Sequence, residues 1–145
     1  MIRKARVSDA AAICQLNQTQ LGYDYPLAQT TSNLERLLAD DQHQLLLVYE
    51  DDATAQVAGY VHAELYEETY FEPMLNVLAL AVASQRQQQG IGSQLMQAVE
   101  ERARRAGLNE VRLNSGAERT VAHHFYEQRG YHCSKQQKRF GKKLR

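Results

Sequence analysis

The chain has 145 residues, which is enough for one ordinary domain with a proper core. Its 17 basic and 17 acidic residues cancel, which argues against a general affinity for nucleic acid or for an anionic membrane. No apolar stretch reaches transmembrane length and the N-terminus lacks an apolar signal core, so we expect a cytoplasmic, soluble protein. Cys14 and Cys133 are too few for a disulfide framework or a zinc site and are expected to be free thiols.

The first half of the chain alternates strand and helix patterns. Ser8 or Asp9 can cap a first helix, whose apolar stripe runs through Ile13 and which ends at Gly22. Asp51 to Thr54 has the composition of a hairpin turn between two apolar runs. The predicted elements are a strand over 2–7, the helix up to Gly22, a helix over 31–39, and strands over 44–49 and 57–66.

The second half begins with an acidic-aromatic link and then a strongly apolar run. Gly107 follows a long amphipathic pattern and should end that helix. Strands first, then strand–helix–strand, indicate an α/β fold with a mixed sheet in a single domain, 1–145. The predicted elements are a strand over 74–83, a helix over 90–106, a strand over 110–114, a helix over 120–129 and two last strands between 131 and 144.

The segment Ser84 to Met96, SQRQQQGIGSQLM, lies on a turn between the apolar strand and the long helix. Glycines there let the backbone approach a ligand, and the helix start offers unpaired N–H donors with a partial positive charge. A main-chain phosphate cradle is therefore predicted. The spacing excludes a Walker loop, because no lysine follows Gly90 or Gly92, and it excludes the three-glycine dinucleotide fingerprint.

Gln87-x-x-Gly90-x-Gly92 resembles the acetyl-coenzyme A signature of the GNAT N-acetyltransferase superfamily. The later run Ala122-His-His-Phe-Tyr126, followed by Gly130-Tyr131, resembles the late helix of that family, one helix and one strand further on. The resemblance implies a mixed, mostly antiparallel central sheet flanked by helices. It also implies direct transfer of an acetyl group from acetyl-coenzyme A to a primary amine of a small molecule or peptide, with no metal. The segment 119–144 looks most like small-amine members such as aminoalkylphosphonate N-acetyltransferases.

The resemblance also implies particular site residues. The Leu80 N–H would face the thioester oxygen, and Tyr126 would protonate the departing thiolate. The family often carries a glutamate base where this chain has Asn76, an amide that cannot accept a proton but can orient a water; Glu64, Glu68 and His62 are the alternatives. The implied coenzyme-binding residues are Leu80, Ala81, Val82, Gln87, Gln88, Gln89, Gly90, Ile91, Gly92, Ser93, Asn114, Ala122 and Tyr126.

Several alternatives remain at this stage. Because the family's base is missing, a catalytically idle acyl-coenzyme A-binding regulatory module is the alternative function. The acidic-aromatic stretch 64–72 favours a cationic amine as acceptor. The alternative is that this stretch is a solvated loop without a role in binding. His123 and His124 are adjacent on a helix and point in different directions, so we expect surface residues rather than a metal site, with His123 pairing with Glu127. An exposed late strand is a candidate edge for a homodimer.

Overall fold

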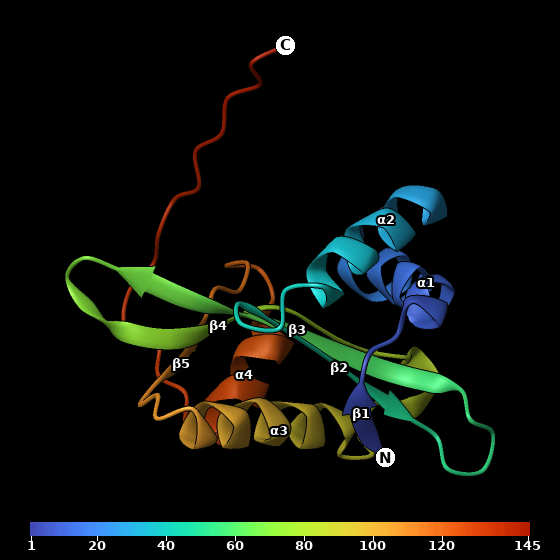
Figure 1. The fold of residues 1–145 in the computed structure, drawn as a ribbon. Coiled ribbons are helices and arrows are strands. Elements are labelled where there is room, and N and C mark those ends of the chain that lie inside the picture. Colours follow the sequence, from blue (N-terminus) through green and yellow to red (C-terminus); the bar gives the residue numbers. More distant parts are fainter. The chain divides into compact units, whose positions relative to one another are not determined.

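A computed structural model describes all residues, 1–145. The chain divides into two compact units, Met1–Leu113 and Asn114–Arg145. The first unit contains a five-stranded sheet in the order β1-β2-β3-β4-β5, as Figure 1 shows. The first four strands pair antiparallel, and β5 pairs parallel with β4. The mixed, mostly antiparallel sheet is thus confirmed. The strands are β1 (Ile2–Lys4), β2 (Gln44–Glu50), β3 (Val57–Glu68), β4 (Phe71–Val82) and β5 (Val111–Leu113).

Helices cover both faces of this sheet (Figure 1). Tyr60 on β3 donates a hydrogen bond to Asn17 on one face, whereas a Cβ built on Gly59 would meet Ile91 and Leu95 of α3 on the other. Neighbouring residues of β3 therefore point to opposite helical layers. None of the helices is both long and apolar enough to cross a bilayer. The elements are α1 (Ala10–Leu21), α2 (Leu27–Leu38) and α3 (Ile91–Arg105), with short 3-10 turns η1 (Val7–Asp9) and η2 (Ser84–Arg86).

The helix predictions hold with shifted bounds. Gly22 ends α1 in a left-handed conformation (φ 77°), as predicted. The second helix begins at Leu27 rather than near 31, because the chain turns helical directly after Pro26. The Pro26 carbonyl accepts bonds from both the N–H and the hydroxyl of Thr30, and the first of these is the first backbone bond of the helix.

The predicted acidic-aromatic link is instead part of a long hairpin. Strand β3 continues to Glu68 and β4 already begins at Phe71. The rings of Tyr66 and Phe71 stack with centroids 5.6 Å apart, and Tyr70 meets Phe71 edge-on at 5.1 Å. Aromatic cross-strand pairs of this kind stabilise a hairpin end, so the aromatic residues extend the strands beyond the apolar run.

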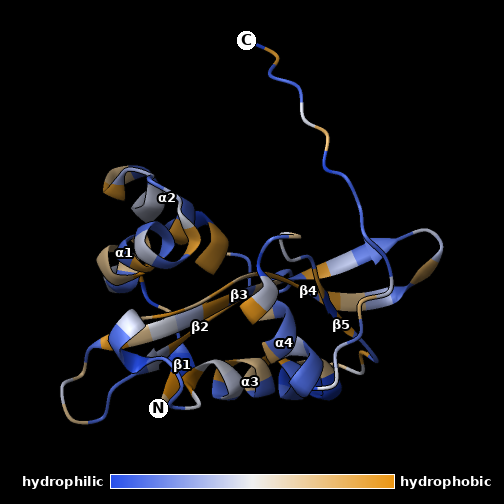
Figure 2. Cartoon of the chain, turned by 180° about the vertical axis from the view of Figure 1, so that it is seen from behind, coloured by the Kyte–Doolittle hydropathy of each residue, from blue (hydrophilic) through white to orange (hydrophobic).

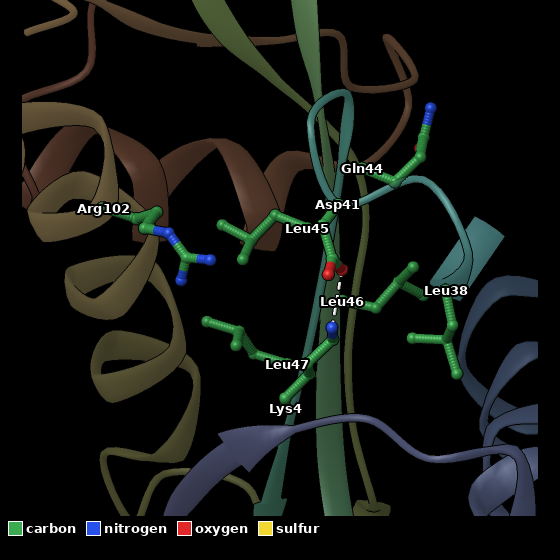
Figure 3. Close-up of a pocket in the computed structure, with 8 residues that line it drawn as sticks. All are labelled: Lys4, Leu38, Asp41, Gln44, Leu45, Leu46, Leu47 and Arg102. Atoms are coloured by element: carbon green, nitrogen blue, oxygen red, sulfur yellow. Dashed lines mark hydrogen bonds and ion pairs between the residues drawn. The ribbon is translucent and has the colours of Figure 1, made fainter. Parts of the chain in front are cut away.

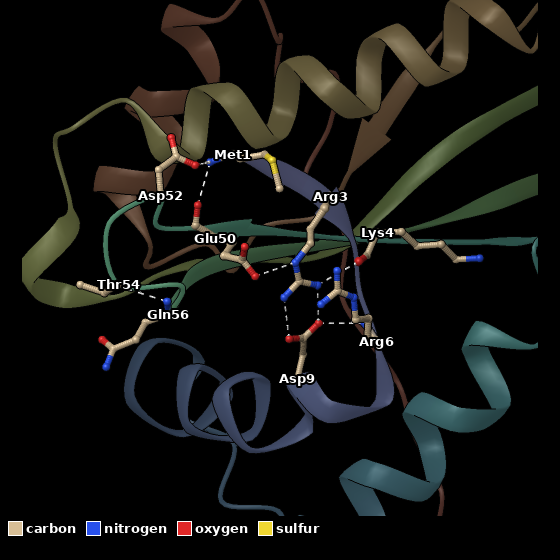
Figure 4. A network of polar contacts seen from close by, with 9 residues as sticks. All are labelled: Met1, Arg3, Lys4, Arg6, Asp9, Glu50, Asp52, Thr54 and Gln56. Atoms are coloured by element: carbon tan, nitrogen blue, oxygen red, sulfur yellow. Dashed lines mark hydrogen bonds and ion pairs between the residues drawn. The ribbon is translucent and has the colours of Figure 1, made fainter.

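A charged network fixes the short first strand (Figure 4). The Arg3 guanidinium donates to both oxygens of Asp9 at 2.9 and 3.0 Å and to Glu50 at 2.9 Å. The N–H of Arg6 also donates to Asp9, at 2.8 Å. Burial works to raise the pKa of Asp9, but the bonds from Arg3 and Arg6 outweigh it and hold that pKa below its ordinary value. Asp9, expected as a helix cap, therefore ties β1 to η1 and makes no side-chain bond to α1, and Arg3 extends the network to Glu50 of β2.

The core of the first unit consists of the apolar faces that these elements turn toward the sheet. In Figure 2 the central strands are largely hydrophobic. Two residues of α3, Leu95 and Met96, have no exposed surface, and neither does Val61 on β3. Cys14 lies in α1 as a half-buried free thiol whose sulfur is 3.2 Å from the Tyr25 carbonyl.

The second unit contains helix α4 (Thr120–Gln128) and a C-terminal segment without regular structure. The prediction of two last strands between 131 and 144 is wrong. Beyond Tyr131 this segment is mostly hydrophilic (Figure 2), and its only large apolar side chains, Phe140 and Leu144, are 89% and 88% exposed. Such a segment buries too little apolar surface to offset the cost of ordering a strand. The exposed late strand expected at a dimer edge is therefore absent, and Cys133 is an exposed free thiol.

Candidate active site

Strand β4 has an open edge next to β5. It pairs with β3 along most of its length, up to Val82, but with β5 only from Leu75 to Val77. Between these two parts Leu78 is an inserted residue, because His62 pairs with Ala79 and the next residue of β3 pairs with Val77. This is a β-bulge, and Leu78 is 50% exposed.

The bulge decides where the amides of β4 point. The Leu75 N–H donates to the Glu110 carbonyl, on the β5 side, whereas the Ala83 N–H donates to the Ala58 carbonyl, on the β3 side. Since amides alternate along a strand, those of Leu80 and Val82 point away from β3, toward the edge that β5 leaves unpaired. The N–H of Leu80 finds no acceptor among the protein groups there. A backbone donor on such an edge is suited to bind an oxygen atom of a ligand.

The start of α3 offers a second group of donors. Gly90 has a left-handed conformation (φ 83°) and precedes the helix, and Gln88 is also left-handed (φ 64°). The first helical bond is donated by Gln94, to the Gly90 carbonyl, at 3.0 Å. The backbone N–H groups from Gln88 to Ser93 donate no hydrogen bond to any protein group. Consecutive free N–H groups at a helix start form an anion site.

Side chains hold this loop in place from two directions. Gln87 donates to the Val82 carbonyl at 3.1 Å and to Gln20 of α1 at 2.9 Å, and Gln20 donates to Ser84 at 2.7 Å. The Gln87 side chain is thus an anchor of the loop. Its backbone N–H is 3.4 Å from the Ser84 carbonyl.

The second anchor is Arg86, which donates to Asp51 at 2.6 Å and to Gln89 at 2.9 Å. Bonds from the backbone N–H of Thr54, from Arg86 and from the N–H of Ala53 lower the pKa of Asp51 to about 2. Asp51 is therefore ionised at neutral pH. The sequence does not predict that Gln20, Ser84, Arg86 and Asp51 hold this loop, because partners so far apart in the chain leave no spacing signal.

Asn76 lies in a polar cluster that spans three strands. It is 7% exposed, its amide nitrogen donates to Glu64 of β3 at 2.8 Å, and Arg112 of β5 donates to its amide oxygen at 2.9 Å. The Arg112 guanidinium also lies over the Tyr66 ring, 4.7 Å from the centroid. Both polar atoms of the amide are engaged, so Asn76 is a structural bridge between the two charged side chains.

The other two candidate bases lie in different surroundings. A ring nitrogen of His62 is 2.7 Å from the Gln44 side-chain oxygen, and burial, against the charge of Glu64, lowers the pKa of His62 below its usual value. His62 lines a groove of about 160 Å³ between the sheet and the first two helices, together with Tyr60 and Tyr25. Glu68 pairs with Phe71 at the end of the β3–β4 hairpin and raises the pKa of Tyr70 by a hydrogen bond.

A smaller pocket of about 40 Å³ lies at the β1–β2 edge of the sheet (Figure 3). Lys4 bonds Asp41 there at 2.5 Å, and Arg102 of α3 lines the pocket. A cavity of this size holds little more than a water molecule. We assign no role to it.

The second unit carries the remaining predicted residues, Asn114, Ala122 and Tyr126. Ala122 and Tyr126 are half-buried and lie one turn apart on α4, so they share a face. The Tyr126 ring meets those of Phe125 and Tyr131 edge-on at 5.2 and 5.9 Å. Burial raises the pKa of Tyr126, and the charge of Arg119 opposes it. The phenol is therefore protonated at neutral pH. The predicted pairing of His123 with Glu127 is wrong, because the His123 ring bonds the Gly116 carbonyl at 2.8 Å.

Comparisons with known proteins agree with this geometry. The acetyltransferase (GNAT) family profile matches residues 10–131. Aminoalkylphosphonate N-acetyltransferase of Salmonella typhimurium is 28% identical over 121 residues, which is 83% of this chain and 75% of the relative.

Solved structures share the fold. The aminoglycoside 6'-N-acetyltransferase of Acinetobacter baumannii superposes with a TM-score of 0.85 at 20% identity, covering 99% of this chain and 98% of the other. The enzyme AAC(6')-Iy, in complex with the bisubstrate analogue CoA-S-monomethyl-acetylneamine, superposes with a TM-score of 0.84 at 18% identity, covering 99% and 98%. The chain belongs to the GNAT acetyltransferase family and is an N-acetyltransferase.

Proposed function

We propose that this protein transfers an acetyl group from acetyl-coenzyme A directly to a primary amine of a small molecule or peptide. The observation that carries the proposal is the run of free N–H groups from Gln88 to Ser93, directly after the open edge of β4. Backbone donors and the helix dipole suit the diphosphate of a coenzyme. The coenzyme also has an arm that contains amide groups. These amides need backbone hydrogen-bond partners, as a neighbouring strand does, and the edge from Leu80 to Val82 offers them.

The chemistry follows from the groups at hand. The Leu80 N–H points to the open edge and stabilises the oxyanion that forms when the amine attacks the thioester. Tyr126 donates its phenolic proton to the departing thiolate. The family pattern around Ala122 and Tyr126 supports this second role, and so does the raised pKa, which keeps the phenol protonated. No step requires a metal.

We further propose that both units act as one acetyltransferase domain. The family profile runs through the boundary at Leu113 and ends at residue 131, inside the second unit. The residues implied in coenzyme binding occur on both sides of that boundary. The second unit alone, with one helix, is too small to form a core of its own.

For the acceptor we propose a small cationic amine. The relatives are named for aminoalkylphosphonates and aminoglycosides, both amine-bearing small molecules. In this chain the end of the β3–β4 hairpin carries exposed Glu67 and Glu68 beside the stacked Tyr66 and Phe71. Carboxylates and aromatic faces both attract cations.

A second function is favoured by one observation, the amide at Asn76 where the family often has a carboxylate. On that view the protein binds an acyl-coenzyme A and does not turn it over. Release of free thiol from acetyl-coenzyme A separates the two, using neamine, 2-aminoethylphosphonate, spermidine and a peptide with a free α-amine as acceptors. Sustained release with at least one amine supports the transferase. Tight coenzyme binding without release supports the binding module, and absence of binding refutes both.

A further inference from the structure

The family often carries its general base at the position of Asn76. An amide cannot accept a proton, so the general base of this chain must be another residue. The hydrogen-bond network fixes how this amide is oriented. Arg112 can only donate, so the amide oxygen must face it and the NH₂ group must face Glu64. Asn76 therefore presents a donor to the Glu64 carboxylate and holds its Oε2 atom in place.

Glu64 occupies the position directly across the strand pair. It is the register partner of Asn76, and only its Oε2 atom is engaged, by the Asn76 amide. The other oxygen, Oε1, accepts no hydrogen bond from the protein. Glu64 is half-buried whereas Asn76 is buried, so the carboxylate is the member of the pair that a ligand can reach.

The surroundings favour Glu64 over the two other candidates. Burial lowers the pKa of His62, which makes it a weaker proton acceptor, and Gln44 already engages its ring. Glu68 lies four residues further along β3, about 13 Å away, at the end of the hairpin. The groups facing Glu64 are His62 on its own strand, the uncharged Gln44 on β2, Asn76 on β4 and, through that amide, Arg112 on β5.

We propose that Glu64 on β3 is the general base of the reaction, and that Asn76 is a positioning residue that holds it. The carboxylate Oε1 takes one proton from the acceptor ammonium, directly or through a water, and leaves the neutral amine. The amine nitrogen then bonds to the thioester carbon, the carbon–sulfur bond breaks, and the thiolate takes a proton from Tyr126. The second proton lost by the nitrogen and the proton on Glu64 pass to solvent, from which Tyr126 is reprotonated.

This inference rests on the proposed function, and the test keeps the two apart. Wild type, Glu64→Gln, Asn76→Ala and the control Glu101→Gln are compared, with neamine and 2-aminoethylphosphonate as acceptors and with the affinity for acetyl-coenzyme A measured in parallel. Glu101→Gln removes the same charge from an exposed residue of α3. Absence of wild-type turnover with both amines, with spermidine and with the peptide refutes the proposed function, and the inference with it.

If Glu64 is the base, Glu64→Gln lowers kcat by about 10²–10⁴-fold and leaves coenzyme affinity unchanged. The deficit shrinks as the pH rises toward the amine pKa, near ~10 for a lysine-like amine, because more of the acceptor is already unprotonated. Asn76→Ala lowers kcat less than Glu64→Gln does and leaves coenzyme affinity unchanged, because the carboxylate remains and loses only the amide that holds it. A kcat of Glu64→Gln within about twofold of wild type, or a deficit that does not change with pH, overturns the proposal.

Discussion

The left-handed glycine at the start of α3 allows a sharp test of the coenzyme cradle. We expect Gly90→Val to weaken acetyl-coenzyme A binding more than it weakens the fold. A Cβ at Gly90 meets no atom within 4 Å, so the cost to folding comes from the backbone conformation at φ 83°. That cost is about 1–2 kcal/mol for a residue with a side chain. In the complex the new side chain lies among the free N–H donors, and each hydrogen bond lost to a charged phosphate is worth about 1.5–3 kcal/mol. One such loss raises Kd by roughly 10- to 150-fold.

Gly107→Val is the matched control. Gly107 follows the other end of α3, has nearly the same conformation (φ 76°), and has no atom within 4 Å of a built Cβ. Seventeen helical steps place it about 25 Å from Gly90. Urea unfolding should give similar losses of stability for the two variants, whereas calorimetric titration with acetyl-coenzyme A should detect a change in Kd only for Gly90→Val. Equal Kd values for the two variants would refute the cradle.

Three further outcomes are expected. Acetyl-coenzyme A at a hundred times its Kd should stabilise the fold by about 2.7 kcal/mol; no rise in Tm at millimolar ligand would contradict coenzyme binding. Tyr126→Phe should keep coenzyme affinity and lower kcat by about 10²–10⁴-fold; equal kcat values would make Tyr126 a packing residue. The folded-state pKa of Asp9 is lowered, so its ion pair with Arg3 stabilises the fold above the unfolded pKa, 3.8, and this contribution is lost as the pH falls through the folded pKa. Asp9→Asn should therefore unfold more easily than wild type at pH 7, with a difference in unfolding free energy that shrinks below pH 3.8; a difference independent of pH would contradict the assignment.

Most of the fold could be predicted from local patterns. The turn at Gly90 and the amphipathic stripe of α3 are signals that lie within a few residues of one another, and both are found where expected. The hairpin end could not be predicted, because Glu67 and Glu68 are typical of a solvated link. The stacking of Tyr66 on Phe71 depends on a cross-strand register that composition does not reveal. The C-terminal strands were overpredicted because alternating charges were interpreted as one face of a sheet without an apolar face opposite.

The candidate site divides in the same way. Backbone groups of the glycine turn could be predicted, since glycine spacing and helix starts dictate them. Side-chain partners such as Gln20 and Arg112 could not, because each meets the site from a distant part of the chain. The sequence predicts that Asn76 cannot act as the base. It does not predict the hydrogen bond from Asn76 to Glu64, because that bond depends on the register between β3 and β4.

Because of the bulge at Leu78, the number of residues between Asn76 and Leu80 matters more than the type of residue at the bulge. Asn76 and Leu80 are an even number of residues apart, and on a regular strand their amides would point to the same neighbour. The single inserted residue reverses this parity, so that the amide of Leu80 points to the open edge while Asn76 still meets β3. Many apolar residues would serve at Leu78, but an insertion or deletion between Asn76 and Leu80 would turn the donor into the sheet. We therefore expect homologous chains to vary in length at the Thr69–Tyr70 turn and in the C-terminal segment, and to keep this interval unchanged.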